Sequence, residues 1–168
     1  MRVSRLILRA FSAFAIAAFL IGCAGRTGIH PRLETGEPAF RDLRWPVAGK
    51  VASGFGGRGG GHHGGFDILA PEGTDVLAAG EGTVVYAGDS LRGYGNAAVL
   101  DHGEGISTLY GHLREICVKS GDVVSPGTVI GTVGRTGNAT TSHLHFEIRV
   151  GGRSVDPAKY LPRTVEQQ

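Results

Sequence analysis

The sequence predicts an all-β fold, either an antiparallel sandwich or a partly open barrel, and three observations lead to this prediction. Short apolar runs rich in Val, Ile, Thr and aromatic residues recur along the chain, with a spacing of about ten residues. Glycine accounts for 29 of the 168 residues. Its usual share is about 7%, and such an excess is typical of tight turns between many short strands. No segment repeats apolar residues at helical spacing over several turns.

The expected strands follow one another along the chain. The first begins at Asp67 and continues into the core through Ile68 and Leu69. Each later run combines β-branched residues with glycine, as short strands bounded by turns do. These runs are VLAAGEGTVVYAG (76–88), AAVLDHG (97–103), ISTLYGHL (106–113), VVSPGTVIGTVG (123–134) and LHFEIRV (144–150). Segments 73–84 and 121–133 share a Gly-x-x-Val start and a Gly-Thr-Val end, which fits either a duplicated motif or the turn pattern of β proteins.

One folded domain is expected over residues 45–162, followed by a tail at 163–168. A domain of this length can bury a modest core without disulfides. Residues 24–44 carry mixed charges and turn-forming residues but no apolar period, so we predict a flexible tether. His30 lies in this tether and has no expected role.

Residues 1–23 predict a lipoprotein signal peptide. Three arginines within the first nine residues precede an apolar run at 10–21, which is too short to span a membrane. The run ends in LIGC, which resembles the bacterial lipobox, where the cysteine is lipidated and becomes the new N-terminus. Several acyl chains on Cys23 would anchor the protein stably. The alternatives are a plain signal peptide cut near Gly22 or an uncleaved anchor.

The residue after Cys23 is Ala24. In Gram-negative lipoproteins, a residue other than aspartate at this position directs the protein to the outer membrane. The resemblance therefore implies a lipid-anchored protein of the cell envelope, on the outer membrane and facing the periplasm.

Charge and cysteine content narrow the possible partners. The chain has 17 basic and 15 acidic residues, and loss of three leader arginines leaves 14 against 15, a net charge of −1. No basic stripe is interleaved with aromatic residues, so nucleic acid is not an expected partner.

With Cys23 lipidated, Cys117 has no partner for an internal disulfide. We interpret Cys117 as a partly buried small side chain.

His143 and His145 are two residues apart in a segment with strand character. Residues i and i+2 of a strand point to the same face, so both imidazoles should enter one site. Leu144 and Phe146 would then point into the core. Glu147 shares the histidine face, where it would either support a histidine or be solvated. The alternative for the pair is two surface histidines.

His63 and Asp67 are four residues apart, and Gly64 and Gly65 between them disfavour a helix. An even spacing in an extended chain places both side chains on one side. A carboxylate beside an apolar strand needs a partner, because an unpaired buried carboxylate is costly. Zinc would be such a partner. His62 is the competing ligand, but its spacing from Asp67 is odd.

Catalytic zinc sites use three protein ligands and keep a fourth position open. Hydrolysis also needs a base for the attacking water and an acid for the leaving amine. The histidine left over from the ligand set and His112, at the end of the run 106–113, could fill these roles. The alternative for His112 is a satisfied structural histidine.

These motifs together resemble the M23 family of zinc metallopeptidases, also called the lysostaphin or LytM-type family. The resemblance rests on Gly-x-Arg, His-x-x-x-Asp-Ile, Tyr-Gly-His-Leu and His-Leu-His-Phe-Glu, and covers about residues 45–161. It includes GYGN (93–96) and segments 70–88 and 120–140. It implies an antiparallel β fold of the duplicated hybrid motif type, with a groove-like zinc site that cuts peptide cross-links of peptidoglycan.

The resemblance also implies roles for individual residues. Its zinc ligands correspond to His63, Asp67 and His145, and its catalytic histidines to His112 and His143. His143 would act as general base on the zinc-bound water, and His112 would stabilise the oxyanion or shuttle a proton. Arg58 matches a frequent family arginine with either a structural or a functional role. The glycines at 59–61 replace any longer loop on the substrate side.

Three functions remain open at this point. The first is a zinc-dependent endopeptidase that remodels the cell wall, which the presence of all five site residues favours. The second is a non-catalytic activator of cell wall amidases, because some family members work in this way. The third is a metal- or carbohydrate-binding β domain without turnover.

The expected partners are peptidoglycan and the membrane, with wall amidases or division proteins as further candidates. The compartment favours a D,D-type cross-link as the bond cut.

Overall fold

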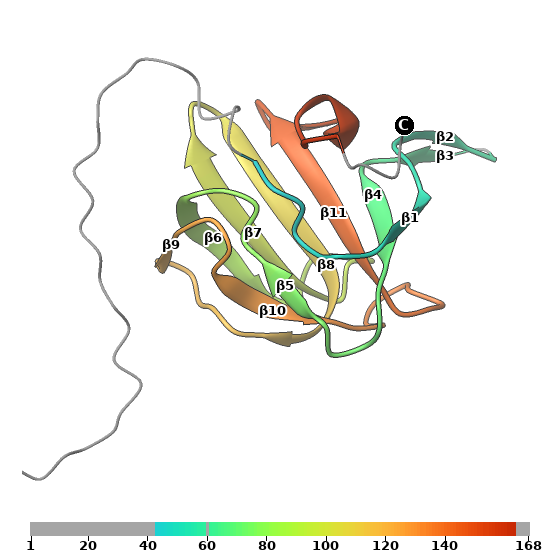
Figure 1. The fold of residues 1–168 in the computed structure, drawn as a ribbon, viewed down its shortest axis with the longest axis horizontal. Coiled ribbons are helices and arrows are strands. Elements are labelled where there is room, and N and C mark those ends of the chain that lie inside the picture. The colour runs from blue at the N-terminus through green and yellow to red at the C-terminus, as the bar shows by residue number, and fades with distance from the viewer. Residues whose placement is uncertain (1–42, 60, 164–168) are drawn as a thin grey trace, which may run out of the picture. The chain divides into compact units, whose positions relative to one another are not determined.

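The computed structural model describes residues 43–59 and 61–163, and this part of the chain is almost entirely β-structure (Figure 1). The predicted all-β antiparallel fold is confirmed, and its sheet is not closed into a barrel. The predicted leader with Cys23 and tether residues 24–42 lie outside the described residues. No helix among the described residues is long and apolar enough to cross a membrane.

Twelve strands are described, and one 3-10 turn follows them at Pro157–Lys159. The strands are β1 (Lys50–Ser53), β2 (Gly56–Arg58), β3 (Gly61–His63), β4 (Phe66–Leu69), β5 (Asp75–Leu77), β6 (Gly82–Gly88), β7 (Asn96–Gly103), β8 (Ile106–Ile116), β9 (Val123–Val124), β10 (Val129–Val133), β11 (His143–Val150) and β12 (Arg153–Val155). Two of the apolar runs expected from the sequence each contain two strands. The second is divided at Ser125, Pro126 and Gly127, where proline lacks an N–H donor and Gly127 has a φ of 85°.

The main sheet has the strand order β1-β4-β11-β8-β7-β6-β9, and all its pairs are antiparallel. β12 pairs with β11, whereas β2 and β3 form a separate two-stranded sheet. The long strand β8 pairs with β11 and β7, and its last residues pair with β10, which also pairs with β5 (Figure 1). β8 therefore connects the main sheet to the β5–β10 pair.

Strand β11 shows how the sequence pattern creates two different faces. Leu144, Phe146 and Ile148 are fully buried in the hydrophobic core, as the alternation predicts. His143, His145 and Glu147 have the opposite parity and are also buried, at 9%, 7% and 2% exposure. A strand buried on both faces is expected when other chain segments cover its polar face.

The two ends of the described domain are joined to each other. The Trp45 indole Nε1 donates a 2.9 Å hydrogen bond to the Pro162 carbonyl oxygen. Trp45 also stacks on Phe66, with ring centroids 6.1 Å apart. Leu43, which the sequence places at the end of the tether, is only 4% exposed and belongs to the core. The packed part of the chain therefore includes Leu43.

The interpretation of Cys117 as a partly buried side chain is wrong, because the residue is an exposed free thiol. It follows directly after the end of β8. Its backbone N–H donates to Ile130 with an N–O distance of 2.9 Å, so the chain is fixed here while the side chain faces solvent.

Candidate metal and catalytic site

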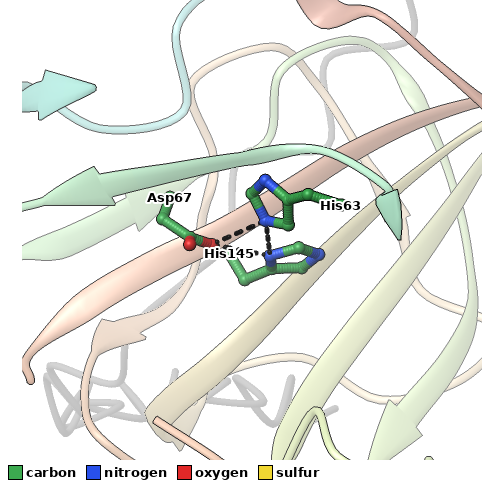
Figure 2. Close-up of side chains that lie close together, drawn as sticks. All are labelled: His63, Asp67 and His145. Atoms are coloured by element: carbon green, nitrogen blue, oxygen red, sulfur yellow. Dashed lines mark hydrogen bonds and ion pairs between the residues drawn. The ribbon is translucent and has the colours of Figure 1, made fainter. Parts of the chain in front are cut away.

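Three strands bring together the side chains of His63, Asp67 and His145 (Figure 2). His63 ends β3, Asp67 lies in β4, and the register pairs Asp67 directly with His145 of β11. His63 Nε2 lies 3.2 Å from His145 Nδ1 and 3.0 Å from Asp67 Oδ1. His145 Nδ1 lies 2.8 Å from the same carboxylate oxygen. Three ligand atoms therefore converge on one point.

In each imidazole, the hydrogen bond made by the outer nitrogen determines whether the inner nitrogen, which faces this point, carries a proton. His63 Nδ1 donates to the Gly54 carbonyl oxygen at 2.7 Å, and His145 Nε2 donates to Glu147 Oε1 at 3.0 Å. In the neutral rings, His63 Nε2 and His145 Nδ1 are then lone-pair donors that face each other. Two such lone pairs beside a carboxylate can be satisfied by a shared cation.

The spacing of these atoms can be compared with that of a metal centre. Tetrahedral zinc with bonds of about 2.0–2.1 Å places neighbouring ligand atoms about 3.3 Å apart. The observed separations of 2.8, 3.0 and 3.2 Å lie close to that value. His63, Asp67 and His145 can therefore hold a metal ion, and their donor set fits zinc.

Arg58 occupies the second oxygen of the same carboxylate. Its Nη2 donates to Asp67 Oδ2 at 2.6 Å and also donates to Ser53 Oγ. Burial alone raises the pKa of Asp67, but hydrogen bonds with His145 and Arg58 and the nearby histidine charges hold the pKa well below its ordinary value. Asp67 is therefore ionised, with one oxygen on Arg58 and one toward the imidazoles.

Glu147 accepts a hydrogen bond from the nitrogen of His145 that faces away from Asp67. Of the two roles expected for Glu147 from the sequence, support of a histidine or solvation, the structure shows the first. Oε1 accepts hydrogen bonds from His145 Nε2 at 3.0 Å and from the Tyr94 hydroxyl at 2.7 Å. Oε2 accepts from Arg149 Nε at 2.7 Å. Burial raises the pKa of Glu147, but these donors outweigh it and lower the pKa to about 2. A buried, ionised carboxylate thus fixes the tautomer of His145.

The two glycines of HHGGFD make room for this carboxylate. A Cβ added to Gly64 would lie 3.0 Å from Glu147 Oε1. A Cβ added to Gly65 would lie 2.1 Å from the Phe146 carbonyl oxygen and 2.9 Å from Glu147 Cγ. Side chains at these positions would separate β4 from β11, and therefore Asp67 from His145.

His112 and His143 lie beside the cluster, with ring centroids 4.7 Å apart. Each Nδ1 donates to a backbone carbonyl oxygen at 2.8 Å, that of Thr136 for His112 and that of Thr141 for His143. Both Nε2 atoms are then proton acceptors in the neutral rings. Burial, followed by the nearby histidines, lowers the pKa of His112 despite the bond to Thr136. His143 Nε2 lies 3.6 Å from Asp67 Oδ1.

All five residues expected from the sequence line one groove with a volume of about 420 Å³. His62 also lines this groove, but its ring packs edge-on against Phe55 at 4.8 Å and stays outside the ligand cluster. Several further residues line the groove although the sequence indicates no role for them, namely Arg92, Tyr94, Asn138 and Thr140. Their only signal was their position within or next to the GYGN motif and segment 120–140.

Comparison with known proteins agrees with this fold and site. The family model for Peptidase family M23 matches residues 61–157, more than half of the chain. The protein therefore belongs to peptidase family M23.

Two relatives illustrate what this chain is similar to in sequence. The murein hydrolase activator NlpD of Escherichia coli K12 is 43% identical over 120 residues, covering 71% of this chain and 31% of that protein. The lipoprotein NlpD/LppB homolog of Pseudomonas aeruginosa is 44% identical over 126 residues, covering 75% and 42%. The chain thus spans less than half the length of these relatives.

Solved structures of two peptidases also share the fold. The catalytic domain of lysostaphin from Staphylococcus simulans has a TM-score of 0.62 at 36% identity, covering 67% of this chain and 91% of that one. A zinc-containing peptidase from Vibrio cholerae has a TM-score of 0.66 at 35% identity, covering 73% and 41%.

Proposed function

We propose that this protein is a zinc-dependent endopeptidase that hydrolyses peptide cross-links of bacterial peptidoglycan. The observation that carries the proposal is the convergence of His63, Asp67 and His145 beside two histidines whose Nε2 atoms can accept protons. The similarity to lysostaphin and to a zinc-containing peptidase supports zinc and peptide hydrolysis. His63, Asp67 and His145 are the zinc ligands in this proposal.

The proposed chemistry divides the work among the residues of the groove. A zinc ion held by His63, Asp67 and His145 would acidify water and polarise a peptide carbonyl. His143 Nε2 accepts the proton of the attacking water, while Thr141 holds the opposite ring nitrogen. The water oxygen forms a bond to the carbonyl carbon of the substrate, the carbon–nitrogen bond breaks, and the proton passes to the leaving amine, so that a carboxylate and an amine are released.

His112 fits the role of proton shuttle better than that of oxyanion donor. Its Nδ1–H is used by the Thr136 carbonyl, and its pKa is lowered by burial and then by the neighbouring histidines. At neutral pH its Nε2 therefore carries no proton to donate to an oxyanion. It can receive a proton and deliver it to the amine.

Digestion of purified peptidoglycan by the zinc-loaded protein tests this proposal, with products separated and identified by mass spectrometry. We expect cross-linked dimers to disappear, a chelator to stop the reaction, and zinc to restore it. His30→Ala serves as a matched control, because His30 lies in the expected tether. Intact dimers after incubation with fully zinc-loaded protein would refute the peptidase.

A second candidate function is activation of cell wall amidases. The relative named murein hydrolase activator NlpD favours it. In this case, His143→Ala would stimulate a purified wall amidase as strongly as the unchanged protein. For an endopeptidase alone, neither protein would alter amidase turnover.

A lipid anchor at Cys23 completes the proposal, with residues 1–23 as the signal peptide and 24–42 as a tether in front of the packed domain. The Pseudomonas aeruginosa relative is named a lipoprotein, which supports this location in the cell envelope. Mass spectrometry of membrane-extracted protein should find acyl chains on Cys23, and Cys23→Ser should release the protein from the outer membrane. An unacylated mature chain would exclude the anchor.

A further inference from the structure

Arg92 is a groove-lining cation that has no partner among the described residues. It lies in the loop between β6 and β7 and is exposed. Among residues 43–59 and 61–163, no hydrogen bond or ion pair involves its side chain, whereas the guanidinium of Arg58 is bound to Asp67. Its charge is therefore available to a ligand in the groove.

The loop that carries Arg92 is held at both ends. The Tyr86 hydroxyl accepts hydrogen bonds from the backbone N–H groups of Ser90 at 2.8 Å and Leu91 at 3.2 Å. On the other side, the Gly93 carbonyl accepts from Asn138 N–H at 3.0 Å. The backbone on both sides of Arg92 is therefore fixed, so its guanidinium starts from a defined point.

The same loop is connected to His112 and to Glu147, which supports His145. Two residues after Arg92, the Tyr94 carbonyl accepts from His112 N–H at 2.7 Å, and the Tyr94 hydroxyl binds Glu147. Beyond it, Gly95 packs against the backbone of Gly137, and a Cβ on either glycine would lie 2.4 Å from a nitrogen of the other. A group bound by Arg92 is thereby positioned relative to the site that would cleave it.

The charge of the groove favours an anionic ligand. Its two carboxylates are already used, since Asp67 binds Arg58 and Glu147 binds Tyr94 and Arg149. No acidic side chain with an unused charge lines the described groove. The planar guanidinium of arginine matches a carboxylate through two parallel hydrogen bonds.

We propose that Arg92 is a specificity-determining residue that binds a free carboxylate of the substrate peptide, next to the bond that is cut. This inference rests on the proposed endopeptidase function and defines its substrate class as peptides with an unblocked carboxylate near the scissile bond. The carboxylate comes either from the peptide's C-terminus or from an acidic group on a neighbouring side chain. Both sources present the same chemistry to Arg92.

Synthetic cross-linked peptides test this inference in three forms: both carboxylates free, the C-terminus amidated, or the side-chain carboxylate amidated. The quantity measured is kcat/KM for the unchanged protein, for Arg92→Gln, and for the control Arg153→Gln, an exposed arginine outside the groove. A charge-assisted hydrogen bond corresponds to a change of about tenfold. We expect kcat/KM for the peptide with free carboxylates to fall about tenfold in Arg92→Gln. For the unchanged protein, one of the two amidations should lower kcat/KM by the same factor.

The pattern across protein and substrate decides the outcome. The amidation that lowers kcat/KM for the unchanged protein should not lower it further for Arg92→Gln. Arg153→Gln should behave like the unchanged protein. Equal rates on all three peptides, or an amidation cost that Arg92→Gln retains, would overturn the inference while leaving the peptidase function in place.

Failure of the peptidase function gives a different result, because no peptide is then cleaved by any protein. Calorimetric titration of the same peptides into zinc-loaded protein decides the inference in that case. About tenfold tighter binding of the free form, lost in Arg92→Gln, would support a carboxylate-binding groove in a non-catalytic protein. Equal affinity for free and amidated peptides would refute it.

Discussion

The Tyr94 carbonyl oxygen accepts a 2.7 Å hydrogen bond from the backbone N–H of His112, whose φ is 62°. This left-handed conformation costs about 1–3 kcal/mol for a residue with a side chain, and it persists only where the surroundings enforce it. The bond between His112 Nδ1 and the Thr136 carbonyl also holds the residue. Because the Tyr94 hydroxyl binds Glu147, Tyr94 connects the His112 side of the groove with the support of His145.

Glu147→Gln should weaken zinc binding. A neutral amide cannot fix the tautomer of His145 as an ionised carboxylate does, and removal of such a support lowers metal affinity by about 10–100-fold. The zinc dissociation constant, measured by chelator competition, checks this. Glu115→Gln is the control, because Glu115 is exposed on the same sheet. An unchanged dissociation constant in Glu147→Gln would show that Glu147 does not support zinc binding.

His145→Ala should lose zinc and peptidoglycan cleavage together. Two protein ligands do not hold catalytic zinc well, since such sites use three. Zinc content measured by atomic emission spectroscopy, alongside a cleavage assay on the same sample, separates this result from misfolding when circular dichroism is unchanged. A variant that retains one zinc per chain would show that His145 is not a ligand.

Gly65→Ala should destabilise the domain by an amount on the order of 3 kcal/mol, because overpacking in a tight interior has this cost. The added Cβ would lie 2.1 Å from the Phe146 carbonyl oxygen, so β4 and β11 would have to separate. Urea unfolding measures the loss. Gly57→Ala is the matched control, because no heavy atom lies within 4 Å of its added Cβ. Equal midpoints would mean that β4 and β11 are less closely packed.

His102 should make the fold sensitive to acid. Burial lowers the pKa of His102 below its ordinary value of 6.5, outweighing its bond to the Glu81 carbonyl and the charge of Asp101. The unfolded chain then binds more protons than the folded one below pH 6.5, so stability falls as the pH drops through 6.5 toward the lower folded pKa. One proton contributes a slope of at most about 1.4 kcal/mol per pH unit.

His102→Gln isolates this contribution, because the other histidines remain in both proteins. Its free energy of unfolding, measured by urea titration between pH 7 and pH 5, should be lower at pH 7 but should decline less toward pH 5. The lower value at pH 7 reflects loss of the ring's bonds to Glu81 and Thr108. Parallel curves for the two proteins would contradict the assignment.

The sequence could predict which residues of β11 share a face, because strand parity depends only on neighbours in the chain. His143 and His145 lie on the polar face, and Leu144 lies in the core. Sequence parity could not show what covers the polar face. The bond from Tyr94 to Glu147 joins residues 53 positions apart, and it depends on how the β6–β7 loop packs. The role of Glu147 was therefore undecided from the sequence alone.

The contact between Arg58 and Asp67 is a second example. It depends on the pairing of β2 with β3, which places Arg58 opposite Gly61. The glycines of this segment gave no strand signal, since strand patterns rely on β-branched and aromatic residues. A short hairpin rich in glycine is defined by its long-range contacts and not by its local propensity.

The most direct test of the central claim is the His143→Ala variant, with zinc content and cleavage of cross-linked peptidoglycan dimers measured on one sample. His143 supplies a base beside the ligand cluster and is not one of the three proposed ligands, so we expect one zinc per chain and loss of cleavage against an active unchanged protein. Dimer cleavage at the unchanged rate by zinc-loaded His143→Ala would contradict the proposed catalytic site.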